Sequence, residues 1–197
     1  MTYDFQERLA FSQGARCETD AKTIMALLDG CQSVAENKSI GNDNGIDYVA
    51  TLRKGTEVFI DAKTREKGCS KYWKNNEPEL AIEKWSVMPG GKFNLDPLRA
   101  KAGWTIDESK ATDMILYTFD PSDCSTAFLL PFQSLRMASR RMIGNWMNRF
   151  KVDVQTSGSW QSQAVFVPAS EVILAIETTF SADVEIASTK DQHSDFF

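Results

Sequence analysis

Three charged residues in the stretch GIDYVATLRKGTEVFIDAKTR, residues 45–65, have the types and spacing to form a site for a divalent cation. Asp47 and Asp61 carry carboxylates, and carboxylate oxygens are the ligands that hard cations such as Mg²⁺ prefer. Lys63 follows Asp61 by two residues, so both side chains point to one face if the segment is a strand. The stretch therefore indicates a hard divalent cation with a charged group beside it.

The alternation of side chains predicts the element that positions these residues. Residues 46–51 and residues 57–63 each alternate between two faces, which is the period of a strand. Lys54-Gly55 stands between them and suits a hairpin turn. Antiparallel pairing of the two arms would bring Asp47 onto the face that carries the second acid and its lysine.

Two other acids compete for the same roles. Asp43 stands among turn-forming residues, where Asp is expected anyway, whereas Asp47 directly precedes an apolar strand and is preferred. Glu57 lies next to the hairpin loop and far from Lys63, which favours Asp61 as the second acid. An acid-x-Lys triplet also arises by chance, so the assignment of Asp61 and Lys63 depends on the further acids Asp47 and Glu18.

The remaining pattern predicts an α/β chain. The 197 residues suit one domain over residues 1–180, with an insertion at about 66–112 and a flexible tail over 181–197. Helices are expected over residues 2–13, 19–28 and 133–150. Strands are expected over residues 31–36, 113–119, 127–130 and 164–167, with a strand or short helix over 80–88 and a short final segment over 171–176.

Composition restricts the chemistry and the compartment. The single histidine, His193, lies in the polar tail, which argues against a histidine base or a His-metal cluster. Four scattered cysteines without a CxxC pair indicate reduced thiols rather than zinc or disulfides, as in a cytoplasmic protein. No apolar run is long enough to span a bilayer and no secretory signal is recognisable, so no membrane partner is expected.

The residues around the hairpin follow the order of a known family. Their order and spacing resemble the PD-(D/E)xK nuclease superfamily, closest to its Holliday-junction-resolvase-like members, over residues 14–65: Gly14, Glu18, Leu27-Leu28-Asp29-Gly30, Asp47-Tyr-Val-Ala and Phe59-Ile-Asp61-Ala-Lys63. This resemblance implies a restriction-endonuclease-like fold, a central mixed β-sheet flanked by helices. It also implies a Mg²⁺-dependent hydrolase that cleaves DNA phosphodiester bonds and accepts Mn²⁺ as a substitute.

The resemblance assigns a role to each site residue. Asp47 and Asp61 would bind the metal directly, and the backbone carbonyl of Ala62 would add a third ligand. Glu18 would reach the metal through water or bind a second ion, although an acid at a helix N-terminus is favourable in its own right and both interpretations stay open. Lys63 would orient or deprotonate the attacking water, or stabilise the developing charge.

Departures from the family pattern leave other interpretations open. The second acid is Asp rather than the commoner Glu, and the segment after Lys63 is longer than in compact resolvases. The net charge of −5 counts mildly against a nucleic-acid partner. A non-catalytic nucleic-acid- or protein-binding module is the main alternative, and a structural protein with an accidental acid-x-Lys triplet is another.

DNA is the expected partner because basic residues gather after the hairpin and on the long helix. The cluster after the hairpin also holds aromatic residues, a mixture that suits phosphates and unstacked bases, although ordinary surface charges would look the same. Many members of the family are dimers, which makes a homodimer compatible with the resemblance. The residues expected to contact DNA are Arg65, Lys67, Lys71, Arg136, Arg140 and Arg141.

Overall fold

A computed structural model describes residues 18–37, 45–65, 69–90, 100–119, 126–157 and 160–179. The helix expected over residues 2–13 and the tail over 181–197 lie outside the described residues, and so do Asp43 and Lys67. The strands, helices and contacts given below belong to the described ranges.

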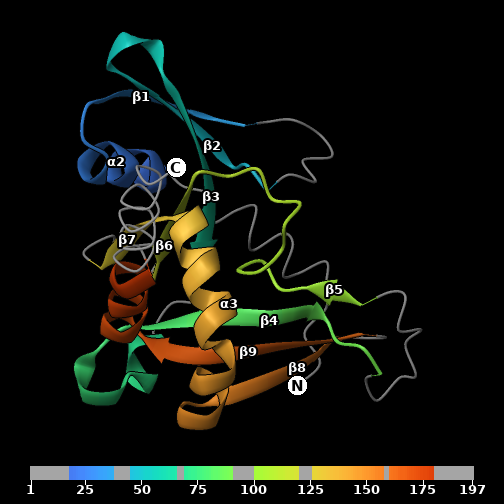
Figure 1. Ribbon diagram of the computed structural model, residues 1–197. Helices are drawn as coiled ribbons and strands as arrows, with labels where there is room; N and C mark the ends of the chain where they lie inside the picture. The colour runs from blue at the N-terminus through green and yellow to red at the C-terminus, as the bar shows by residue number, and fades with distance from the viewer. Residues whose placement is uncertain are drawn as a thin grey trace, which may run out of the picture.

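The predicted hairpin forms the middle of a five-stranded mixed sheet (Figure 1). Neighbouring strands are antiparallel except β3 and β6, which are parallel. The hairpin turns at the short 3-10 helix η1 (Arg53–Gly55), where Lys54 and Gly55 have φ of 75° and 77°. The strand order is β1 (Cys31–Glu36), β2 (Tyr48–Leu52), β3 (Glu57–Thr64), β6 (Met114–Thr118) and β7 (Ala127–Pro131).

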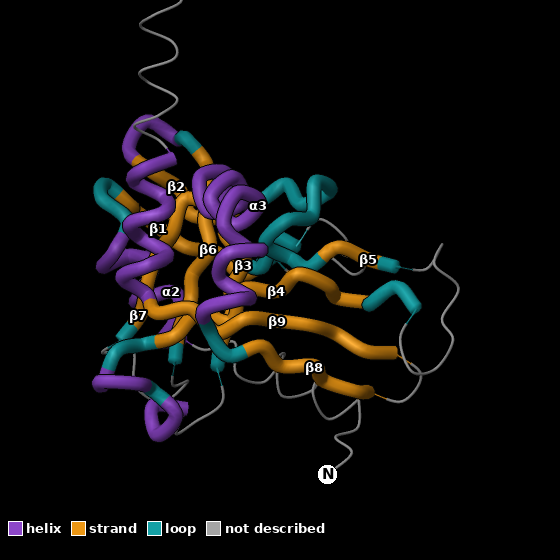
Figure 2. Tube along the Cα trace, turned by 60° about the horizontal axis from the view of Figure 1, so that its bottom comes forward, coloured by secondary structure: helices purple, strands orange, loops and turns teal. Residues whose placement is uncertain are grey.

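A second, antiparallel sheet joins two distant parts of the chain (Figure 2). Its strands are, in spatial order, β5 (Lys101–Ala102), β4 (Glu79–Val87), β9 (Trp160–Pro168) and β8 (Val152–Ser157). Two short 3-10 helices, η2 (Cys69–Tyr72) and η3 (Lys74–Asn76), precede β4. The segment expected as an insertion therefore supplies β4 and β5, and these pair into one sheet with strands that follow α3.

Helices cover both faces of the mixed sheet. Helix α2 (Glu18–Leu27) packs Ile24 against Tyr48, Ile60 and Leu116 on one face. On the other face lie α3 (Phe132–Arg149), the second sheet and a helix over residues 169–179. None of the helices within the described ranges is long and apolar enough to cross a membrane.

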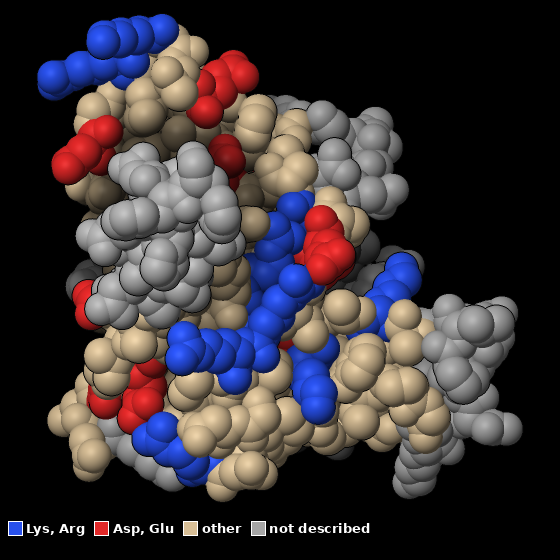
Figure 3. Space-filling model, viewed as in Figure 1, with Lys and Arg blue, Asp and Glu red and all other residues tan. Residues whose placement is uncertain are grey.

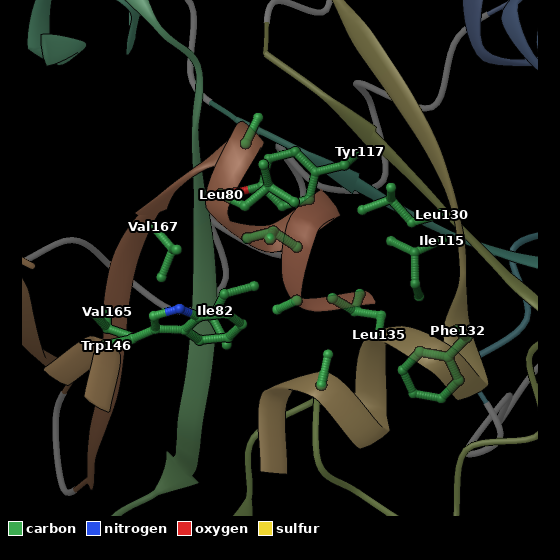
Figure 4. Close-up of a cluster of buried hydrophobic side chains, with 14 of the residues drawn as sticks. Leu80, Ile82, Ile115, Tyr117, Leu130, Phe132, Leu135, Trp146, Val165 and Val167 are labelled. Atoms are coloured by element: carbon green, nitrogen blue, oxygen red, sulfur yellow. The ribbon is translucent and has the colours of Figure 1, made fainter. Parts of the chain in front are cut away.

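The larger core lies between the two sheets and α3 (Figure 4). Strand β6 is buried on both faces, since Ile115 and Tyr117 enter this core while Leu116 between them faces α2. A strand buried on both faces explains the uninterrupted apolar run MILY in the sequence. The side chains that fill this core include Leu80, Ile82, Ile115, Tyr117, Leu130, Phe132, Leu135, Trp146, Val165 and Val167.

The structure confirms the general α/β class and most of the predicted elements, with three differences. The segment 80–88, left open between strand and helix, forms strand β4 up to Val87. The final segment is a helix and extends over residues 169–179. Strand β8 was not predicted, because its sequence VDVQTS is polar and alternates only weakly at the edge of its sheet.

Leu80 tests whether β4 belongs to the core rather than to a dispensable insertion. Its side chain is 1% exposed, so replacement by alanine should lower the free energy of unfolding by about 2–5 kcal/mol. Leu174, which is 59% exposed, provides the matched control, and its replacement should change stability by less than about 0.5 kcal/mol. Urea unfolding measures both, and equal effects would contradict the described packing of β4.

Candidate functional site

Asp61 is a buried carboxylate on β3, beside the parallel strand β6. The residue is only 1% exposed, and a buried charge is costly unless it is paired. Both of its oxygens are paired: Lys63 Nζ lies 2.5 Å from Oδ1, and Lys110 Nζ lies 3.1 Å from Oδ2. The site is therefore organised around one carboxylate that receives two ammonium groups.

Asp47 meets Asp61 from the other arm of the hairpin. Tyr48 pairs with Ile60, so Asp47 stands opposite Asp61, and its backbone N–H donates to the Ile60 carbonyl at 2.8 Å. Its Oδ2 accepts the backbone N–H of Ala62 at 2.9 Å. The Asp47 carboxyl is also close enough to Asp61 to influence its pKa. The structure thus brings together the two acids that the hairpin pattern selected.

Lys63 occupies the outer side of this pair. It shares a face with Asp61 because alternate residues of a strand point the same way. Its ammonium also lies 5.7 Å from the centre of the Trp104 ring, within the range of a cation–π contact. The side chain keeps 28% of its surface exposed, so the ammonium stands between a buried carboxylate and solvent.

The charges around Asp61 keep it ionised. Burial alone would raise its pKa, but the positive charges of Lys63 and Lys110 outweigh this effect. Hydrogen bonds from Lys63 and with Asp47 act in the same direction, and together they hold the pKa of Asp61 below its usual range. Asp61 is therefore a carboxylate anion at neutral pH.

Lys110 was missed by the sequence analysis. It is 49 residues from Asp61 along the chain, and only the parallel pairing of β3 with β6 brings the two together. The segment that carries it stands directly before β6 and is attached to the start of β3 through Thr112, whose hydroxyl donates to the Phe59 carbonyl at 3.0 Å. No local motif marks such a residue.

Helix α3 and β4 hold the loop that carries Lys110. At its beginning, the Thr105 hydroxyl donates to the backbone carbonyl of Glu83 on β4 at 2.7 Å. Further along, Arg136 donates to the carbonyl of Asp107 at 3.0 Å. Arg140 donates to the carbonyl of Ile106 and forms an ion pair with Glu108 at 2.6 Å. The loop is thus bonded to both β4 and α3.

Gly45 is the residue over which Lys110 passes. A Cβ at this position would lie 2.2 Å from Lys110 Nζ, closer than two such atoms can approach. Gly45 also has a φ of 69°, a conformation that other residues rarely adopt. A glycine two residues before Asp47 therefore allows Lys110 to reach Asp61.

Glu18, the third acid suggested by the sequence, begins α2, and its side chain lies outside what the structure describes. Helix α2 covers the face of the sheet opposite to Asp61, because Ile24 packs on Ile60, the neighbour of Asp61. The acid by which α2 contacts the sheet is Asp20, which accepts the Tyr48 hydroxyl at 3.1 Å. The role of Glu18 stays a prediction.

The basic residues expected to contact DNA have diverse surroundings. On the face shown in Figure 3, basic side chains gather over and beside α3, with acidic atoms between them. Arg136 and Arg140 bond the loop described above, and the Arg65 guanidinium stacks 4.9 Å from the Phe166 ring. Lys71 and Arg141 are exposed. Five of the six residues lie within the described ranges, and Lys67 lies outside them.

The donors at this site suit a hard cation. Two facing carboxylates, one of them held anionic, offer the oxygen ligands that Mg²⁺ prefers. Within the part of the chain that the structure describes, no group of three or more His, Cys, Asp and Glu side chains converges on a common position. A cation here would therefore rely on two carboxylates, backbone oxygens and water, as Mg²⁺ often does.

This chain matches no protein-family model, no curated protein and no solved structure. The resemblance to the nuclease superfamily therefore rests on the residues of the sequence alone.

Asp61 predicts how stability depends on pH. Its folded pKa lies below the ordinary value of 3.8, so its ion pairs add stability above that pH, and this contribution is lost as the pH falls through the folded value. Asp61→Asn should lower stability at pH 7 by about 1–3 kcal/mol, because the buried carboxylate loses its charge-assisted bonds with Lys63 and Lys110.

Urea unfolding between pH 7 and pH 2 tests this prediction. The Asp61→Asn protein should lose less stability below pH 4 than the wild type does. Asp29→Asn, at an exposed acid after α2, should keep the wild-type pH dependence. A wild-type slope in the Asp61 variant would contradict the assignment.

Proposed function

We propose that this protein is a Mg²⁺-dependent nuclease of the restriction-endonuclease-like type that hydrolyses DNA phosphodiester bonds. The observation that carries this proposal is the meeting of Asp47 and Asp61 across the hairpin, with Lys63 bonded to Asp61 from two residues further along β3. A mixed sheet with helices on both faces supports it, because that is the architecture the family resemblance implies.

Each residue of the site has a task in this reaction. Asp47 and Asp61 would hold the cation, and Ala62 directly follows Asp61 on β3, so its carbonyl could complete the set. When bound, the cation polarises a phosphate oxygen and makes a bound water more acidic. Lys63 would orient or deprotonate that water or neutralise charge on the phosphate, since its ammonium lies at the edge of the pair and is partly exposed.

The surface offers cations for a DNA backbone. Arg141 and Lys71 are exposed. Arg136 and Arg140 use part of their hydrogen-bonding capacity within the fold, but a guanidinium has five N–H donors, so each can still donate to a phosphate. Glu18 remains a candidate for a water-mediated or second-ion role.

One observation favours a second function, a non-catalytic nucleic-acid- or protein-binding module. Both oxygens of Asp61 already accept ammonium groups, and two carboxylates with two lysines have no net charge. Such a network needs no metal to balance the charge of its carboxylates. On this alternative, Lys110 would complete a structural network and the protein would bind its partner without cleaving it.

Lys63→Met separates the two functions. If Lys63 acts on the attacking water, turnover should fall by about 10²–10⁴-fold, the usual contribution of a general acid–base group, while DNA binding persists. Lys22→Met, at an exposed position of α2 on the opposite face, should leave turnover unchanged. The assay is cleavage of linear, nicked, branched and single-stranded DNA with Mg²⁺ or Mn²⁺.

The same assay can reject the enzyme. Wild-type protein that cuts none of these DNAs, and whose melting temperature is the same with and without Mn²⁺, would contradict the nuclease and leave the binding module. A Lys63→Met protein that cleaves at the wild-type rate would instead show that Lys63 has no part in the chemistry.

A further inference from the structure

Lys110 approaches Asp61 from the side of Asp47. Its ammonium is 3.1 Å from Asp61 Oδ2, and it passes so close to Gly45 that a Cβ there would overlap it. Gly45 stands two residues before Asp47 on the arm of the hairpin opposite β3. Lys110 therefore reaches Asp61 past the start of the arm that carries Asp47, whereas Lys63 lies beside the Trp104 ring.

Lys110 occupies an oxygen of Asp61 that a cation bound by both carboxylates could use. A divalent ion bound by both carboxylates must contact Asp61 on its Asp47 side. An ammonium at hydrogen-bonding distance from Oδ2 competes with a metal ion for that oxygen and repels the ion by its charge. Lys63 bonds the other oxygen of Asp61, Oδ1, and also contacts the Trp104 ring.

The loop around Lys110 favours a side chain that can leave while its backbone stays. Arg136 and Arg140 hold the backbone carbonyls of residues 106 and 107, and Thr112 holds the other end of the loop on β3. The Lys110 side chain itself is 16% exposed, and lysine has a long flexible stem. Its ammonium can thus exchange Asp61 for solvent without unfolding the loop.

We propose that Lys110 is a displaceable counter-ion of Asp61 and thereby sets the affinity of the site for divalent metal. This inference rests on the proposed function in one respect, that the ligand of the two carboxylates is a metal ion. Without metal, Lys110 supplies positive charge beside the Asp47 and Asp61 carboxylates, which would otherwise repel each other. A metal ion must displace Lys110 from Oδ2, which raises the concentration of metal that the site requires.

Two substitutions remove this competition by different routes. Lys110→Met deletes the ammonium, and Gly45→Ala places a Cβ where the ammonium now lies. Gly30→Ala is the matched control, since Gly30 has a similar φ of 75° but a Cβ added there would have no atom within 4 Å. Backbone strain is thus common to both glycine variants, and only Gly45→Ala moves Lys110.

Mn²⁺ binding to the full chain is the measurement, made by calorimetry and by the loss of the free-ion signal in electron paramagnetic resonance. Lys110→Met and Gly45→Ala should bind Mn²⁺ about tenfold more tightly than the wild type, which corresponds to about 1.4 kcal/mol of competition removed. Gly30→Ala should bind as the wild type does. A side chain with a purely structural role would not increase affinity when it is removed.

The outcomes separate this inference from the proposed function. Equal or weaker Mn²⁺ binding by both test variants, in a wild type that binds Mn²⁺ and cleaves DNA, overturns the counter-ion and leaves the nuclease standing. Binding that occurs only in the test variants supports the counter-ion and rejects metal catalysis by the wild type. No binding in any protein overturns both. If Lys110→Met does not fold, Gly45→Ala alone decides.

Discussion

Burial of the Asp61 carboxylate is the constraint on which the site depends. A carboxylate with 1% exposure must be given hydrogen bonds and opposite charge, or else it would take up a proton. Lys63 meets this need from the same strand, and Lys110 meets it from a loop that is 49 residues away in sequence. Lys110 can reach Asp61 because its loop is held in place and because Gly45 has no Cβ to overlap the ammonium.

The two sheets and α3 supply that support. The loop follows β5 and is bonded to β4 where the Thr105 hydroxyl donates to the Glu83 carbonyl. It then bonds Arg136 and Arg140 of α3 and leads into β6 beside β3. Arg136 and Arg140, which the sequence suggested as DNA contacts, therefore also position the residues around the carboxylate pair. Changes to these arginines would therefore alter the site as well as the surface charge.

The hairpin and its acids could be predicted because the information is local. Alternation over about twenty residues determines which side chains share a face, and Lys54-Gly55 marks the turn, so Asp47, Asp61 and Lys63 were selected without other elements. Lys110 and the second sheet depend on pairings between distant segments, and no local pattern encodes those.

The central claim is that Asp47 and Asp61 together bind a divalent cation. The most direct test is the anomalous diffraction of a crystal of this protein soaked in Mn²⁺. The account predicts one Mn²⁺ with an oxygen of each carboxylate about 2.1 Å away, a distance typical of a small hard cation, and Lys110 Nζ no longer bonded to Asp61. Anomalous density absent from this pair, with Lys110 still on Asp61 at saturating Mn²⁺, would contradict it.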